Sequence, residues 1–251
     1  MPWGYVVNSS DSKDRSVKVR AIFSSDHINT AHAIRDILKD KIDAPLGRWN
    51  ASDYLSFHLL SSIYDEGIHL HKPVWCLYPS HDGAQIGVLD IFARYASRMF
   101  RENFYSDLLL RGQAVDSRHR TRREAKKYGG ISEPSIEDQF RSIHINPKYA
   151  NSIKGKSVIV LDDFITTGGS FEAARNYLYE AEAIDVHCIA VGKFPTPHKS
   201  YSISREIDPF VLNEDISSQD LVINQCEKWS NYDSRLNIFL MNQIRLLLGY
   251  K

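Results

Sequence analysis

Apolar and polar positions along the chain follow two patterns, which together predict an α/β fold. Short apolar or alternating runs predict strands at 16–23, 72–80, 107–110, 158–161 and 185–194. Longer segments with apolar residues at helical spacing predict helices at 29–42, 50–67, 86–104, 171–183 and 234–250. Because strands and helices follow each other in turn, we expect a Rossmann-like, mostly parallel sheet flanked by helices.

Two of the predicted helices carry an apolar stripe that indicates which side faces the sheet. In the segment 50–67 the stripe consists of Tyr54, Leu55, Leu59 and Ile63, and Gly67 ends the helix. In the segment 86–104 it consists of Val88, Phe92, Tyr95, Ala96 and Met99. We expect both stripes to be buried.

The strongest strand patterns begin near Lys72, and this divides the chain into three parts. We predict an α/β core at 71–200, with an N-terminal addition at 1–70 packed on it. The remaining residues, 201–251, are predicted to form a helical C-terminal extension, because they end in a segment with apolar residues at helical spacing.

Composition and charge narrow the class of protein. Of the 251 residues, 43% are hydrophobic and 25% are charged, which excludes a disordered or fibrous protein. The 31 Lys and Arg residues balance the 31 Asp and Glu residues, which argues against a protein that coats nucleic acid through bulk charge.

The 3 cysteines are dispersed along the chain, which indicates a reducing compartment. No apolar run approaches the ~18 residues of a membrane span. We therefore expect a soluble, cytoplasmic protein without a membrane partner.

One region lacks the hydrophobic pattern and is strongly basic. The basic segment, 111–127, has Arg or Lys at positions 111, 118, 120, 122, 123, 126 and 127, against two acidic residues. Long polar segments of this kind are commonly lids or binding loops, whereas a solvated surface loop is the alternative. A contact with nucleic acid is a third interpretation.

The strand at 158–161 leads into a sequence with the features of a binding site. The stretch "VIVLDDFITTGGS" (158–170) sets Asp162 and Asp163 after the apolar run, and hydroxyl residues and glycines before a helix. At the carboxyl edge of a parallel sheet, hydroxyls, bare glycine backbone and a helix N-terminus form a receptor for a phosphate monoester. The acids would repel a phosphate, so they suit ribose hydroxyls or a hydrated Mg²⁺ ion beside it. The stretch therefore favours a sugar phosphate.

This stretch has two alternative interpretations. A strand that ends in two surface acids before a capped helix explains an isolated acid pair, but explains the full series of threonines, glycines and serine less well. A P-loop is the nearest alternative nucleotide site, because "GKS" occurs at 155–157. It is excluded, because Ala150 stands where the P-loop requires glycine and "GKS" precedes a strand instead of following one.

The stretch "VIVLDDFITTGGS" resembles the phosphoribosyl-pyrophosphate (PRPP) motif of the type I phosphoribosyltransferases. The resemblance implies the fold of that family, with a hood formed by added elements from the termini. It implies that Asp162 and Asp163 are the catalytic acids, which contact the ribose hydroxyls and hold Mg²⁺ through water and PRPP. It also implies a 5′-phosphate site formed by Thr166, Thr167, Gly168, Gly169 and Ser170.

The same resemblance implies a pyrophosphate site. The turn after the strand at 72–80 corresponds to the pyrophosphate-binding loop of the family, and the basic segment corresponds to its flexible catalytic loop. The residues expected to contact pyrophosphate are Ser80, His81, Asp82, Arg122, Arg123 and Lys126. The basic segment is most similar to that of the amidophosphoribosyltransferase-like subgroup, which includes competence-factor proteins.

The resemblance also implies a reaction and its partners. Lys193, in "CIAVGKFPTP", is similar to a lysine of purine phosphoribosyltransferases that touches the acceptor base. We expect transfer of the 5-phosphoribosyl group from PRPP to an unidentified nitrogenous acceptor, with Mg²⁺ as cofactor and with a homodimer as the possible assembly. The alternative is a PRPP or nucleotide sensor without turnover. Such a protein could be an accessory subunit of a larger bacterial system, for example retron-type anti-phage defence, that touches nucleic acid through the basic segment.

Overall fold

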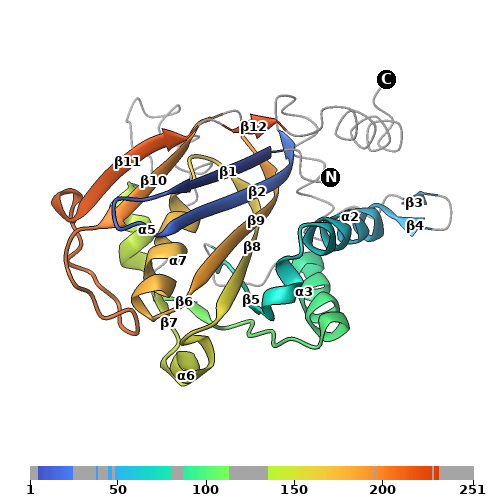
Figure 1. Ribbon diagram of the computed structural model, residues 1–251, viewed down its shortest axis with the longest axis horizontal. Helices are drawn as coiled ribbons and strands as arrows, with labels where there is room; N and C mark the ends of the chain where they lie inside the picture. The colour runs from blue at the N-terminus through green and yellow to red at the C-terminus, as the bar shows by residue number, and fades with distance from the viewer. Residues whose placement is uncertain are drawn as a thin grey trace, which may run out of the picture.

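A six-stranded, mostly parallel sheet forms the centre of the molecule (Figure 1). In the computed structural model its strands lie in the order β12 (Ser230–Asn231), β1 (Tyr5–Ser10), β2 (Ser16–Ser24), β9 (Asp185–Lys193), β8 (Ser157–Ile165) and β5 (Val74–Leu77). Strands β2, β9, β8 and β5 are parallel, whereas β1 is antiparallel to both β2 and β12. The structure describes residues 5–24, 38, 45–46, 49–80, 87–112, 135–194, 196–227 and 229–231.

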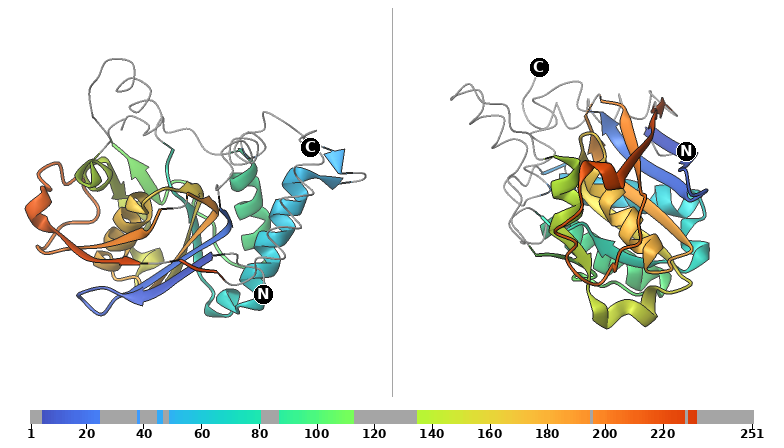
Figure 2. Two further views of the ribbon diagram at one scale, coloured as in Figure 1. Left: turned by 90° about the horizontal axis from the view of Figure 1, so that it is seen from above. Right: turned by 90° about the vertical axis from the view of Figure 1, so that its left-hand side faces the viewer.

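Helices cover both faces of the sheet (Figure 2). On one face lie α2 (Ala51–Asp65) and α3 (Gly87–Phe100), and on the other lie α5 (Ile136–Ser142) and α7 (Gly169–Glu180). Along β8, Val158 and Val160 belong to the core on the α7 side, and Ile159 and Leu161 belong to the core on the α3 side. A strand buried on both faces needs a continuous apolar run, which explains why β8 was recognised in the sequence.

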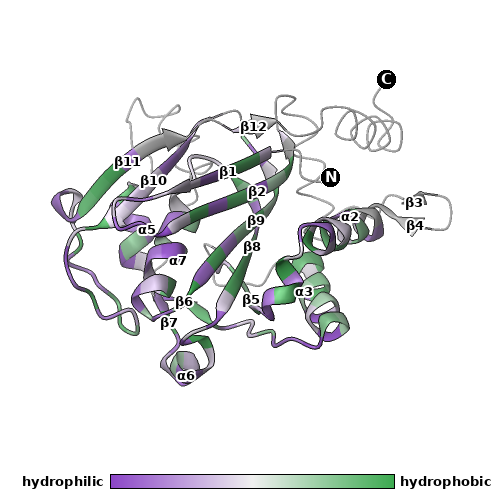
Figure 3. Ribbon diagram, viewed as in Figure 1, coloured by the Kyte–Doolittle hydropathy of each residue, from purple (hydrophilic) through white to green (hydrophobic). Residues whose placement is uncertain are grey.

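The two helical layers differ in polarity (Figure 3). Helix α3 buries an almost wholly apolar face, which consists of Val88, Leu89, Phe92, Ala93, Ala96 and Ser97. Helix α7 buries Phe171 and Tyr177, but also the polar side chains of Glu172, Arg175 and Asn176. The buried face of α7 therefore includes charged side chains, whereas the buried face of α3 does not.

The remaining elements form short helices and three small antiparallel sheets. The paired strands are β3 (Pro45–Leu46) with β4 (Trp49–Asn50), β6 (Leu109–Arg111) with β7 (Ile143–Ile145), and β10 (His198–Ile203) with β11 (Leu221–Glu227). The short helices are η1 (Ile68–His71), η2 (Pro147–Tyr149), α6 (Ala150–Ile153) and η3 (Ser218–Asp220). Strand β10 packs beside α7, and this matters for the site described below.

Most of the predicted core elements are confirmed, with one error in a buried face. The strands predicted at 16–23, 72–80 and 185–194 correspond to β2, β5 and β9, and the helices at 50–67 and 86–104 to α2 and α3. Tyr95 and Met99 were expected in the buried stripe of α3 but are 68% and 65% exposed. The buried arc of this helix is centred on Leu89 and Ala96, and Tyr95 and Met99 lie at its margin.

Both terminal regions contribute strands next to the core. Strand β2, from the region 1–70, pairs in parallel with β9 in the middle of the sheet, so the first strands of the chain belong to the same sheet as the predicted core. In the region 201–251, where a helical extension was expected, the described residues form β11 and β12, because "LVINQCE" suits an extended edge strand. The helices predicted at 29–42 and 234–250 lie outside the described residues, apart from Leu38. None of the helices in the described part of the chain is long and apolar enough to cross a membrane.

Candidate functional site

Strand β8 extends beyond its neighbour β5 at the carboxyl edge of the sheet. β5 pairs with β8 only as far as Leu161, whereas β9 follows β8 as far as Ile165. The strand is therefore longer than the predicted 158–161, and Asp162 and Asp163 lie within it instead of following it. Both acids thus lie where β8 passes the end of β5, at the edge where parallel sheets bind their ligands.

The β8–α7 turn, residues 166–168, leads from β8 directly into α7 (Figure 1). Gly168 adopts the left-handed conformation, with φ 90° and ψ −1°, and α7 begins at the next residue. A Cβ atom at Gly168 would lie 2.1 Å from Cε1 and 2.2 Å from Nδ1 of the His198 ring. Both the backbone conformation and the packing therefore require glycine at this position.

The turn and the end of β8 line a hollow that is open to solvent, which we call the β8–α7 hollow. Its lining consists of Asp162, Phe164, Ile165, Thr166, Gly168, Gly169, Ser170 and Phe171. Five of the seven residues predicted as catalytic acids or phosphate ligands are therefore brought together there. The other two are Asp163 and Thr167, which lie beside the lining. The Asp163 carboxylate accepts a hydrogen bond from the backbone N–H of Phe164 at 2.7 Å.

Asp162 has an unusual electrostatic environment. Enclosure by the protein, and next the negative charge of Asp163, raise the pKa of Asp162 well above its ordinary value. The backbone N–H of Asp163 donates to Asp162 Oδ1 at 2.8 Å, and the guanidinium of Arg111 is attractive, but the two together do not cancel the shift. A hydroxyl donor or a cation bound beside Asp162 would relieve this repulsion.

Arg111 is a site residue that the sequence analysis did not single out from the basic segment. It ends β6 and is anchored: Nε and Nη2 donate to the carbonyl oxygens of Ser80 and Pro79, both at 3.0 Å. Nη1 donates to Ser142 Oγ at 2.8 Å, and the guanidinium lies 5.5 Å from the ring centre of Tyr78. The predicted pyrophosphate residue Ser80 is therefore held next to a fixed positive charge. The sequence did contain a signal for Arg111, because this arginine directly follows the strand predicted at 107–110.

A polar bridge connects this arginine region to the phosphate turn. Gln139 Oε1, from α5, accepts hydrogen bonds from Tyr78 Oη at 3.2 Å and from Ser170 Oγ at 3.4 Å. Burial raises the pKa of the Tyr78 phenol, so it stays protonated and donates. The residue after β5 and the first turn of α7 are thus joined through side chains, and nothing in the sequence around Gln139 indicated this.

Lys193 lies at the carboxyl end of β9, opposite Ile165 of β8. Its side chain is buried, at 5% exposure, and Nζ lies 4.5 Å from the ring centre of Tyr5 and 5.3 Å from that of Trp229. Nζ also donates to the carbonyl oxygen of Phe194 at 3.3 Å. The predicted acceptor residue is therefore near the hollow but is covered by aromatic rings from both terminal regions.

The other predicted pyrophosphate residues lie outside the described residues. These are His81, Asp82, Arg122, Arg123 and Lys126. Of the basic segment, the structure describes only Arg111 and Gly112.

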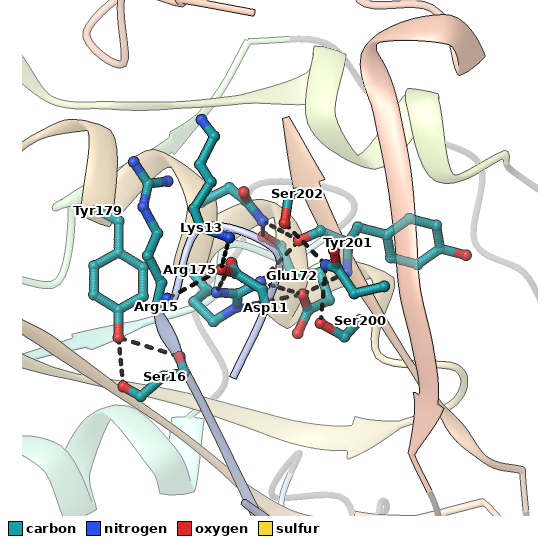
Figure 4. Close-up of polar contacts among 12 residues, drawn as sticks. Asp11, Lys13, Arg15, Ser16, Glu172, Arg175, Tyr179, Ser200, Tyr201 and Ser202 are labelled. Carbon is teal, nitrogen blue, oxygen red and sulfur yellow. Dashed lines mark hydrogen bonds and ion pairs between the residues drawn. The ribbon is translucent and has the colours of Figure 1, made fainter. Parts of the chain in front are cut away.

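A buried charge cluster next to the turn consists of Asp11, Glu172, Arg175 and His198. Figure 4 shows the contacts among Asp11, Glu172 and Arg175. Arg175 binds Asp11 at 2.7 Å and Glu172 at 2.8 Å, and its Nη2 also donates to the carbonyl oxygen of Tyr201 at 2.8 Å. The second oxygen of Glu172 lies 2.8 Å from His198 Nε2. Burial alone would raise the pKa of Glu172, but Arg175 and His198 outweigh it and lower this pKa to about 2. The cluster joins the first turn of α7 to the β1–β2 hairpin and to β10.

Within the described residues, no group of three or more His, Cys, Asp and Glu side chains is arranged to hold a metal ion. Asp162 and Asp163 nevertheless form a donor set of two adjacent carboxylates. Mg²⁺ typically binds through one or two carboxylates and completes its shell with water and substrate phosphates. The two acids therefore fit an ion that arrives with a phosphorylated substrate.

No protein-family model matches the chain, and a search of curated proteins likewise finds no match.

Proposed function

We propose that the protein is a phosphoribosyltransferase with the fold of the type I family, and that it binds PRPP in the β8–α7 hollow. The observation that carries the proposal is the lining of this hollow. Asp162 and the turn residues Thr166, Gly168, Gly169 and Ser170 meet there, at the carboxyl edge of parallel strands and at the N-terminus of α7. A sugar phosphate needs both an anion receptor and acceptors for its hydroxyls, and the hollow offers both.

The 5′-phosphate would bind at the turn. The first N–H groups of a helix have no partners within the helix, and the helix dipole adds a partial positive charge. Thr166 and Ser170 belong to the same lining, and the glycines allow a ligand to approach the backbone closely. Hydrogen bonds to a charged group contribute about 1.5–3 kcal/mol each, so three or four of them would hold the phosphate firmly.

The acids would bind the ribose. Asp162 and Asp163 accept hydrogen bonds from the vicinal hydroxyls, directly or through the water shell of Mg²⁺. A bound Mg²⁺ ion would supply charge neutralisation for the pyrophosphate leaving group. The raised pKa of Asp162 supports this role, because burial and the neighbouring carboxylate favour a partner that donates hydrogen bonds or carries positive charge.

The reaction would be a displacement at the anomeric carbon of PRPP. A nitrogen atom of the acceptor forms a bond to this carbon, and the bond to the pyrophosphate oxygen breaks, so that its electron pair leaves with pyrophosphate. The proton that the attacking nitrogen carried is released to water. The negative field of Asp162 and Asp163 would stabilise the positive charge that develops on the ribose. Arg111, fixed against the carbonyl oxygens of Pro79 and Ser80, would favour the departing anion.

Calorimetric titration of PRPP with and without Mg²⁺ tests this proposal, on the wild type and on Asp163→Asn. We expect Mg²⁺-dependent binding that is weakened at least tenfold in the variant, because one charged hydrogen-bond acceptor is lost. Asp215→Asn is the matched control, since the side chain of Asp215 is 75% exposed and lies on a different loop. A folded wild type that does not bind PRPP would contradict the proposal.

The release of pyrophosphate then separates an enzyme from a sensor. Nitrogenous acceptors (purine and pyrimidine bases, amines and ammonia) are screened with PRPP and Mg²⁺. Release that depends on an acceptor and is lost in Asp163→Asn supports transfer. Binding without release for any acceptor class would instead support a PRPP sensor.

A further inference from the structure

Residues 196–199, which lead into β10, form hydrogen bonds with the carbonyl groups of the β8–α7 turn. Thr196 Oγ1 donates a hydrogen bond to the carbonyl oxygen of Thr166 at 2.6 Å. The backbone N–H of Lys199 donates to the carbonyl oxygen of Thr167 at 3.0 Å. Two consecutive carbonyls of the turn are therefore directed toward residues 196–199.

This orientation determines where the N–H groups of the turn are directed. The peptide bonds here are trans and planar, so each N–H is directed opposite to the carbonyl of the same peptide unit. Because the carbonyls of Thr166 and Thr167 are directed toward β10, the N–H groups of Thr167 and Gly168 are directed away from it. The described residues 196–199 are not part of the lining of the β8–α7 hollow, whereas Thr166 and Gly168 are. The peptide planes after Thr166 and Thr167 are thus fixed at the edge of the hollow, with their N–H groups on the side away from β10.

The segment that imposes this orientation is itself fixed. Trp229 Nε1 donates to the carbonyl oxygen of Thr196 at 2.9 Å, and the edge of its ring faces the His198 ring at 6.0 Å. His198 Nε2 in turn lies 2.8 Å from Glu172 in the first turn of α7. The His198 ring occupies the space next to Gly168. Thr196 therefore acts from a rigid support and not from a loose loop.

Resting on the proposed function, we propose that Thr196 is a positioning residue for the 5′-phosphate of PRPP. Its hydroxyl does not touch the ligand. It holds the Thr166 carbonyl on the β10 side, so that the peptide plane at the start of the turn has its orientation before the ligand arrives. Preorganised donors bind an anion more tightly than donors that must first reorient.

The test compares two variants that differ in one functional group. Thr196→Val keeps the shape of the side chain and removes the hydroxyl, whereas Thr196→Ser keeps the hydroxyl. Titration with PRPP and Mg²⁺ should show binding weakened roughly tenfold in Thr196→Val and within about twofold of wild type in Thr196→Ser. The melting temperatures of both variants should stay close to that of the wild type.

Other results would overturn the inference in distinguishable ways. Wild-type affinity in Thr196→Val, or equally weak binding in both variants, would exclude a role for the hydroxyl. A loss of affinity that only accompanies a lower melting temperature would mean a structural role. If Thr196→Val does not fold, the test uses Trp229→Phe, which removes the hydrogen bond from Trp229 Nε1 to the Thr196 carbonyl oxygen. This variant should also bind PRPP more weakly than the wild type, by a smaller factor than expected for Thr196→Val. Unchanged binding in Trp229→Phe overturns the inference. A wild type that binds no PRPP contradicts the proposed function itself, and this is seen before any variant is compared.

Discussion

The helical layers on the two faces of the sheet bury different kinds of side chain. Helix α3 packs on the sheet through Val88, Leu89, Phe92 and neighbouring small residues, whereas α7 packs through Phe171 and Tyr177 together with Glu172 and Arg175. Helix α3 packs on the sheet through an apolar face. The α7 layer supports the candidate site, and its buried charges connect the turn to β10 and to the β1–β2 hairpin. The difference suggests that one face mainly stabilises the fold, while the other also fixes the geometry of the site.

Removal of Arg175 should have the largest effect on stability. Arg175→Met leaves the carboxylates of Asp11 and Glu172 buried without their cation, which costs about 3–5 kcal/mol of unfolding free energy. Urea unfolding followed by circular dichroism measures this loss. The matched control is Arg205→Met, which breaks an ion pair with the exposed Asp215 and should cost less than about 1 kcal/mol. Equal losses in the two variants would mean that the buried cluster has no special role.

Truncation of the α3 layer should lower stability but not affinity. Phe92 is 5% exposed in the apolar core, and Phe92→Ala is expected to cost about 3 kcal/mol through lost burial and the cavity left behind. At a temperature where the variant is folded, its affinity for PRPP should equal that of the wild type. A large loss of affinity in a folded Phe92→Ala protein would contradict the division of roles between the two layers.

The smallest predicted effect concerns a pH-dependent contact on the α3 side. Glu102 Oε2 accepts a hydrogen bond from Trp75 Nε1 at 2.5 Å, while Oε1 is buried without a partner. Burial raises the pKa of Glu102 from 4.5 to about 7, and the Trp75 hydrogen bond only partly opposes the shift. The folded carboxyl thus holds its proton more tightly than the unfolded one. Its stabilising contribution is fully present below pH 4.5 and is lost as the pH rises through about 7.

Glu102→Gln tests this sign. The variant resembles the protonated carboxyl at every pH, so it should be more stable than the wild type at pH 8, by about 1 kcal/mol after solvent screening. At pH 4.5 the two proteins should have nearly equal unfolding free energies. Glu182→Gln, at an exposed position, serves as the control and should show no pH-dependent difference. If Glu102→Gln is equally or less stable at pH 8, the carboxyl is already neutral or better paired than the contacts indicate.

The sequence was most informative where one physical requirement governs a whole segment. Strands β8 and β9 are buried on both faces, so their apolar runs were recognisable. The glycines after β8 were expected to let a ligand approach the backbone, and at Gly168 the structure places the His198 ring against the backbone. The length of β8 was underestimated, because Asp162 and Asp163 are polar residues that remain paired with β9. Polarity alone does not mark the end of a strand that remains paired with its neighbour.

The support of the site was not predictable from local patterns. Glu172 and Arg175 lie three residues apart on a helix and resemble an ordinary surface pair. Their burial depends on Asp11 and on β10, which are distant in the sequence. Thr196 and Trp229 likewise acquire a role only through contacts with the turn and with each other. Such contacts depend on tertiary structure, and no periodicity in the chain encodes them.

The pairing of β2 with β9 also has a consequence for synthesis of the chain on the ribosome. The β1–β2 hairpin is local and can form as soon as it emerges from the ribosome. Strand β9, which pairs with the free edge of β2, follows about 160 residues later. At translation rates of about 5–20 residues per second, that edge waits roughly 8–30 s for its partner. An exposed strand edge is a template for wrong pairing. The nascent chain is therefore most vulnerable to aggregation before β9 is made, and a chaperone that binds the hairpin during this interval would protect it.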